Sequence, residues 1–74
     1  MSRVVVYTAP GCSLCEPALA AVREACGDDF EVVDISDDPA LEAEYRPSLP
    51  VVEVDGERAF AYFVDAEALR ALLA

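Results

Sequence analysis

The first half of the chain alternates between an apolar run and a segment with helical spacing. Residues 3–8 form a β-branched run that ends at the turn signal Pro10–Gly11. A run of this kind is typical of a strand buried on both faces. From Ser13 to Cys26 the apolar residues recur every three or four positions, and Gly27 then provides a stop. The pattern predicts a central strand, then a helix whose buried stripe comprises Cys15, Leu19, Val22 and Cys26.

A second strand and a short helix follow. Phe30–Ile35 is rich in β-branched and aromatic residues and predicts a strand. Asp38 and Pro39 have the residue types preferred at the N-cap and first position of a helix, and Pro47 ends that helix. The strand, helix, strand order predicts two parallel strands joined by a right-handed crossover.

The last third predicts a hairpin and a final helix. Val51–Val54 and Arg58–Tyr62 flank the turn signal Asp55–Gly56, and Asp65 caps a helix that runs to Leu73. A hairpin can extend the sheet only by antiparallel pairing. The sequence therefore predicts one α/β domain over residues 1–74: a three-layer α/β/α fold of order βαβ-α-ββα around a four-stranded mixed sheet. At this length a second core could not bury enough surface to fold.

Charge narrows the range of partners. Fifteen acidic residues stand against five arginines, with no lysine or histidine, which gives a net charge of −10. Such a surface repels phosphate backbones and anionic lipid, so we expect neither nucleic acid nor membrane as a partner.

The apolar run at 3–7 is too short for a secretion signal, and no stretch is long enough to span a bilayer. We therefore expect a cytoplasmic monomer. Reducing conditions there favour catalytic or metal-binding cysteines over structural disulfides.

The candidate chemistry lies in two closely spaced cysteines. Cys12 and Cys15 stand at the start of the predicted helix, one turn apart. The helix N-terminus stabilises a thiolate, which is the reactive form of cysteine. We expect Cys12 to act as the nucleophile and Cys15 as the resolving thiol, forming a redox-active Cys12–Cys15 disulfide. About 16 Å of helix separates Cys26 from Cys15, which is beyond the reach of a disulfide. We therefore interpret Cys26 as an unreactive buried side chain rather than a third catalytic thiol.

Metal handling is the alternative use of the same pair. A structural zinc site needs four ligands, whereas the chain offers three cysteines and no histidine. Cu(I) carriage, or an iron–sulfur cluster bridged by a dimer, needs fewer ligands from each chain. Soft-metal chaperones usually follow a βαββαβ order, which lacks the helix predicted here between the second and third strands. An interaction scaffold with an idle dithiol is a third possibility.

Two segments together resemble the glutaredoxin-like branch of the thioredoxin superfamily. They are Tyr7-Thr-Ala-Pro-Gly-Cys12-Ser-Leu-Cys15 and, some 35 residues later, Ser48-Leu-Pro50-Val-Val. The resemblance implies a thioredoxin-like fold and thiol–disulfide exchange. It also implies that Pro50 is cis and lies beside the active-site sulfurs, and that the backbone of Leu49 pairs with an extended substrate. Tyr7 and Arg46 are further candidates for substrate contact.

The sequence departs from glutathione-dependent glutaredoxins at two places. Their Gly-Gly-x-Asp segment is here Ala61-Tyr-Phe-Val-Asp65, and the lysine that they often carry before the nucleophile is Ala9. Arg46 is the nearest remaining partner for a carboxylate. We expect disulfide-containing proteins as substrates, glutathione or a thioredoxin-reductase-type enzyme as electron donor, and no bound cofactor or metal.

Overall fold

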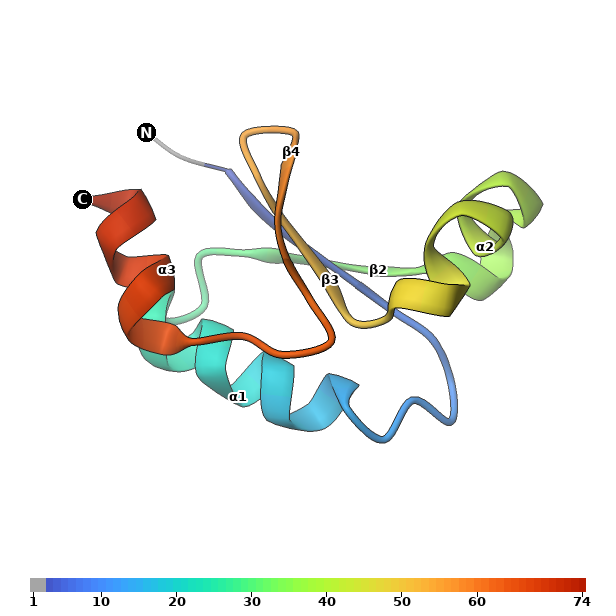
Figure 1. Ribbon diagram of the computed structural model, residues 1–74, viewed down its shortest axis with the longest axis horizontal. Coiled ribbons are helices and arrows are strands. Elements are labelled where there is room, and N and C mark those ends of the chain that lie inside the picture. The colour runs from blue at the N-terminus through green and yellow to red at the C-terminus, as the bar shows by residue number, and fades with distance from the viewer. Residues whose placement is uncertain (1–2) are drawn as a thin grey trace.

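The computed structural model describes residues 3–74 and is built around a four-stranded mixed sheet (Figure 1). The strand order is β2-β1-β3-β4. β1 pairs with β2 in parallel and with β3 antiparallel, and β3 pairs antiparallel with β4. This is the βαβ-α-ββα order and mixed sheet that the sequence predicts. The strand bounds are β1 Val4–Thr8, β2 Glu31–Asp34, β3 Val51–Val54 and β4 Glu57–Ala61.

Two helices cover one face of the sheet, and a third lies at one end of the other face. α1 (Cys15–Cys26) and α3 (Ala66–Leu73) share the larger core with β1 and β3. Its fully buried members are Val4, Val6, Val22, Val52 and Leu69. α2 (Pro39–Tyr45) lies at the opposite end of the sheet from α3 (Figure 1). No helix within residues 3–74 combines the length and apolarity needed to cross a membrane.

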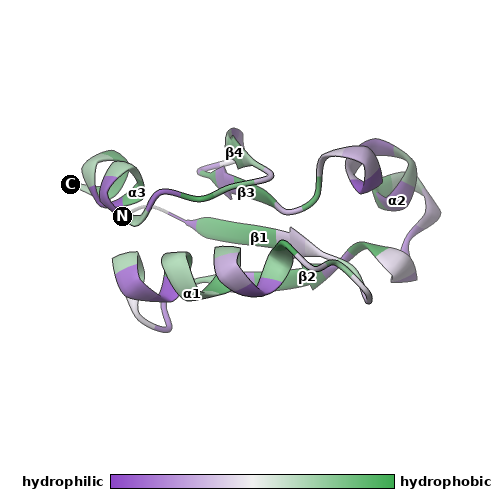
Figure 2. Cartoon of the chain, turned by 60° about the horizontal axis from the view of Figure 1, so that its bottom comes forward, coloured by the Kyte–Doolittle hydropathy of each residue, from purple (hydrophilic) through white to green (hydrophobic). Residues whose placement is uncertain are grey.

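A smaller core lies beneath α2, at the end of the sheet where the cysteines are located. Ala9, Ile35, Tyr45 and Val51 are buried there, and Leu49 packs against them. β1 is apolar over most of its length in Figure 2 and paler only at its carboxyl end, and it contributes to both cores. Burial of one large aliphatic side chain stabilises the fold by about 1.5–3 kcal/mol, so these few residues hold the two layers together.

Side-chain caps and one turn define several element ends as predicted. Asp38 accepts a hydrogen bond of 2.9 Å from Ala40 N, and Asp65 accepts one of 2.9 Å from Glu67 N. Both contacts satisfy amide groups that a helix start leaves unpaired. Asp55 and Gly56 have φ values of 54° and 85°, the left-handed geometry of a two-residue hairpin turn.

Several predicted boundaries differ from the observed ones by one or two residues. α1 begins at Cys15 rather than Ser13, since Leu14 occupies the N-cap position and its side chain caps nothing. β2 ends at Asp34 because the Asp34 carboxylate accepts from Ser36 N, which turns the chain into the 3-10 helix Ile35–Asp37. β4 ends at Ala61 because Tyr62 adopts a φ of 71°.

Candidate functional site

Cys12 and Cys15 are joined by a disulfide at the junction between β1 and α1. Their Cα atoms are 5.4 Å apart, an ordinary span for such a bond. A tight turn brings the two residues together: Cys12 N donates to Ala9 O at 3.3 Å, and Cys15 N donates to Cys12 O at 3.3 Å. Cys15 is the first residue of α1, so the dithiol stands at a helix N-terminus, where unpaired amides favour negative charge.

The two cysteines differ in exposure. Cys15 is buried, with 4% of its surface exposed, and it packs at the base of the turn. Cys12 is partly exposed and lines two surface cavities. The sulfur of Cys12 is therefore the one that an incoming molecule meets first.

The segment before β3 forms the wall opposite Cys12. The Leu49–Pro50 peptide bond is cis, and Pro50 is fully buried. Leu49 is extended, with φ −63° and ψ 145°, and shares a cavity of about 270 Å³ with Cys12 and Arg46. The Arg46 guanidinium forms an ion pair with Glu42 at 2.9 Å, so its charge is already partly neutralised. The structure thus brings Cys12, Leu49 and Arg46 together.

A second cavity adjoins the first and shares Gly11, Cys12 and Ser13 with it. Cys12 and Cys15 both line it, and Glu16 supplies its charged side chain. The remaining lining residues are small or apolar (Thr8, Ala9, Gly11, Ser13 and Leu19). The two cavities therefore differ electrostatically, with an arginine in one and a carboxylate in the other.

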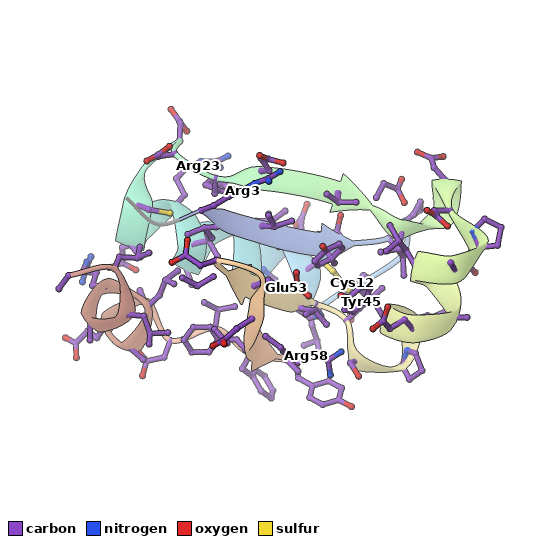
Figure 3. All side chains as sticks on the ribbon, turned by 90° about the horizontal axis from the view of Figure 1, so that it is seen from above. Arg3, Cys12, Arg23, Tyr45, Glu53 and Arg58 are labelled. Carbon is purple, nitrogen blue, oxygen red and sulfur yellow. A yellow bond between two sulfur atoms is a disulfide. The ribbon has the colours of Figure 1, made fainter. Side chains whose placement is uncertain are left out.

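Tyr7 lines neither of these cavities and instead belongs to a polar cluster with Tyr45, Glu53 and Arg58. Figure 3 labels the last three of these residues. Tyr7 Oη donates to Glu53 Oε1 at 3.2 Å, and Tyr45 Oη donates to Glu53 Oε2 at 2.6 Å. The two rings stack with centroids 4.4 Å apart, and the Arg58 guanidinium lies 5.5 Å from the Tyr45 centroid.

The cluster raises the pKa of both phenols. For Tyr45 the main cause is the hydrogen bond to Glu53, followed by burial. For Tyr7 burial is the main cause, followed by the nearby Glu53 charge. The sequence does not predict that Glu53 and Arg58 belong to this cluster. Tyr7 is far from both in sequence, and contacts between distant residues leave no local signal.

Two exposed aromatic residues beside the Leu49–Pro50 segment were also missed as site residues. Tyr62 N donates to Pro50 O at 2.9 Å, and Tyr62 Oη donates to Pro47 O at 3.2 Å. Phe63 follows with 74% of its surface exposed. The sequence signal for these two residues is that Tyr62 and Phe63 stand where glutathione-dependent glutaredoxins carry a glycine pair. This replacement indicates a loss of access to the backbone and, equally, a gain of exposed apolar surface.

Cys26 takes no part in the dithiol. Its thiol is free and half-buried, and its Sγ donates to Val22 O at 3.1 Å. Burial is the main cause that raises its pKa, with the Asp29 charge second. Within residues 3–74 no three Cys, Asp or Glu side chains come together as a metal-binding group.

Comparisons with known proteins agree with this geometry. A family model described as "Glutaredoxin-like domain (DUF836)" matches residues 3–74. No curated protein matches the chain. Among solved structures, target protein XcR50 from X. campestris is 36% identical, with a TM-score of 0.79 over 95% of this chain and 93% of that one. Protein Ne2328 from Nitrosomonas europaea is 27% identical, with a TM-score of 0.78 over 99% and 92%.

Oxidised glutaredoxin 2 from Chlamydomonas reinhardtii shares the fold at 22% identity, with a TM-score of 0.65 over 96% of this chain and 73% of that one. The α/β architecture is therefore that of the thioredoxin-like fold. The Cys12–Cys15 disulfide, in a chain that matches a glutaredoxin-like family model, supports a thiol–disulfide redox function. Because the family model spans nearly the whole sequence, the chain belongs to the glutaredoxin-like domain family.

Proposed function

We propose that the protein is a thiol–disulfide oxidoreductase in which Cys12 is the nucleophile and Cys15 the resolving thiol. The supporting observation is the unequal exposure of the pair: Cys12 is partly exposed and lines both surface cavities, whereas Cys15 is 4% exposed and lines only one of them. An exposed thiol can attack a disulfide on a large partner, and a buried thiol can attack only the sulfur beside it.

The reaction proceeds by two displacements. The Cys12 thiolate attacks one sulfur of the partner disulfide, forming a mixed disulfide and releasing the partner's other sulfur as a thiolate. The Cys15 thiolate then attacks the Cys12 sulfur and releases the partner's remaining thiol. The partner gains two electrons and becomes a dithiol, and the protein loses the same two electrons and becomes the Cys12–Cys15 disulfide.

Leu49 and Pro50 form the proposed binding edge for the substrate backbone. Leu49 is extended and lines the cavity at Cys12, which is the geometry that strand-like pairing with a peptide requires. Arg46 lines the same cavity and is suited to contact a substrate carboxylate, although its ion pair with Glu42 weakens that contact. The proposed cycle requires no bound cofactor.

A second reductant must return the disulfide to the dithiol. We propose glutathione or a thioredoxin-reductase-type enzyme as this donor, with disulfide-containing proteins as the oxidised partners. A cytoplasmic setting, where thiols are kept reduced, favours operation in the reducing direction. Because the chain carries a net charge of −10, anionic glutathione meets electrostatic repulsion that an enzyme donor with a basic surface would not.

Three single variants test the assignment of roles. With a disulfide-containing protein as substrate, we expect Cys15→Ser to accumulate a mixed disulfide, since the resolving attack is lost. Cys12→Ser should form no mixed disulfide and lose turnover, and Cys26→Ser is the matched control with turnover unchanged. Mixed-disulfide formation by Cys12→Ser would contradict the assignment. Stoichiometric copper or iron in the purified protein, together with absent turnover, would favour the metal-carrier alternative.

A further inference from the structure

Of the five large apolar side chains that are exposed within residues 3–74, one lies in the dithiol turn and two lie on the segment that is bonded to Pro50. Leu14 lies between the two cysteines and is 37% exposed, while Tyr62 and Phe63 are 47% and 74% exposed. Leu14 and Leu49 line the same cavity at Cys12, and Tyr62 is bonded to Pro50 and therefore adjacent to Leu49. These residues form an apolar rim, defined here as Leu14, Leu49, Tyr62 and Phe63.

The turn that presents the two aromatic residues is strained. Tyr62 has a φ of 71°, and Phe63 N donates to Ala61 O at 2.8 Å across it. This is a γ-turn with positive φ, a rare conformation that glycine would adopt at lower cost. The Tyr62 hydroxyl is fixed to Pro47 O, so the side chain helps to hold this conformation. Strain of this kind is concentrated at functional sites.

The charges near the apolar rim indicate the charge that a complementary substrate segment carries. Four of the five arginines are in ion pairs, and the fifth, Arg58, lies over the Tyr45 ring. The second cavity at Cys12 carries the Glu16 carboxylate. A binding segment with positive charge is therefore attracted by the whole molecule and by the one charged side chain of that cavity.

Resting on the proposed oxidoreductase function, we propose that the apolar rim and Glu16 select an extended protein segment in which the reacting cysteine has a bulky apolar neighbour and a basic neighbour. The apolar side chain packs on Leu14, Tyr62 and Phe63, and the basic side chain lies at Glu16. Tyr62 and Phe63 are thus specificity-determining residues, and the segment they accept differs in charge and shape from glutathione.

Four probe peptides of equal length test this preference. Each carries one cysteine in a disulfide with an aromatic thiol, flanked by leucine or serine on one side and by lysine or aspartate on the other. Pre-reduced protein attacks the peptide sulfur through Cys12 and releases the aromatic thiol, which is read by absorbance. Cys15 then displaces the peptide thiol, so each probe yields two thiols and the protein yields one disulfide. Single-turnover rate constants are compared without added glutathione.

We expect the wild type to react about tenfold faster with the leucine–lysine peptide than with the serine–aspartate peptide, the scale of partial burial of one apolar side chain. Phe63→Ser and Tyr62→Gly should each lower the leucine-to-serine rate ratio several-fold, and Glu16→Gln should lower the lysine-to-aspartate ratio. Tyr62→Gly also relieves the strained turn, which offsets the loss of the hydrogen bond from Tyr62 Oη to Pro47 O. Leu72→Gln on α3 is the matched control: Leu72 is 54% exposed, and this variant should keep both ratios.

The experiment distinguishes a failure of substrate selection by the rim from a failure of the proposed oxidoreductase function. If the wild type reduces oxidised mercaptoethanol but reacts equally with all four peptides, or if Phe63→Ser and Leu72→Gln behave alike, the rim does not select substrates and the oxidoreductase function stands. If the wild type reduces neither oxidised mercaptoethanol nor any peptide, the proposed function itself is wrong and the selection falls with it.

Discussion

The phenol of Tyr45 donates a 2.6 Å hydrogen bond to Glu53, and this contact joins the two ends of the segment that carries Leu49 and Pro50. Tyr45 is the last residue of α2, and Glu53 lies within β3. Stacking with Tyr7 fixes the Tyr45 ring from the side of β1. The wall opposite Cys12 is therefore held by a partly buried polar contact as well as by the smaller core.

Removal of the Tyr45 hydroxyl should weaken this anchor. Tyr45→Phe leaves the ring but takes one hydrogen bond from the Glu53 carboxylate, and we expect the free energy of unfolding in urea to fall by about 1.5–3 kcal/mol. Tyr62→Phe is the matched control, because the Tyr62 hydroxyl bonds a neutral carbonyl at the surface. A loss in Tyr45→Phe no larger than in the control would show that the contact does not anchor the segment.

Stability should decline at alkaline pH because of the same cluster. The pKa of Tyr45 and that of Tyr7 are raised in the folded protein, so the folded state keeps phenol protons that the unfolded chain releases above about pH 10. Their contribution is complete below that pH and is lost as pH rises through the folded pKa values. We expect the free energy of unfolding to fall from about pH 10 upward, and less steeply in Tyr45→Phe. An identical pH dependence in both proteins would contradict this.

We expect the thiol of Cys26 to react slowly with alkylating agents. Burial and the Asp29 carboxylate raise its pKa, so less thiolate is present at neutral pH than in an unperturbed cysteine. In the oxidised protein we expect iodoacetamide to modify Cys26 several-fold more slowly than in the urea-unfolded protein, with a profile displaced to higher pH. Asp29→Asn should increase the rate modestly because burial is the larger cause. Equal rates in the folded and unfolded states would exclude this picture.

Turnover with glutathione should become faster as the salt concentration rises, because salt screens the repulsion between two negatively charged partners. The chain carries a net charge of −10 and glutathione is an anion. Raising the ionic strength from about 0.01 M to about 0.15 M shortens the screening length from about 30 Å to about 8 Å, so we expect the rate of reduction by glutathione to increase severalfold. Neutral mercaptoethanol is the control reductant and should show little change. A rate with glutathione that falls with salt would indicate a dominant attraction, with Arg46 as the candidate.

Local signals were sufficient to predict the strands, helices and dithiol. The hairpin turn at Asp55–Gly56 and the helix caps at Asp38 and Asp65 each follow from the chemistry of one or two neighbouring residues, and the structure confirms them. The pair Cys12 and Cys15 is likewise a short motif whose placement before a helix needs only the apolar periodicity.

Features that depend on distant residues were not predictable in the same way. Glu53 appears in the sequence as an ordinary polar position of a strand, and only the alignment of β1 with β3 and of α2 above them brings two phenols to it. The strained turn at Tyr62 is also invisible locally, because tyrosine disfavours the left-handed conformation that the link to Pro50 and Pro47 imposes.

We expect Cys12 and Cys15 to form a two-electron couple, with Cys26 outside it. The most direct measurement equilibrates the protein in buffers of graded reduced-to-oxidised glutathione ratio, quenches with an alkylating agent and reads each cysteine by mass spectrometry. We expect one transition, in which Cys12 and Cys15 pass together from two alkylated thiols to an intramolecular disulfide, while Cys26 remains alkylated after denaturing quench throughout. If no intramolecular disulfide forms at any ratio, and Cys12 carries only glutathione, Cys12 and Cys15 do not form a redox couple.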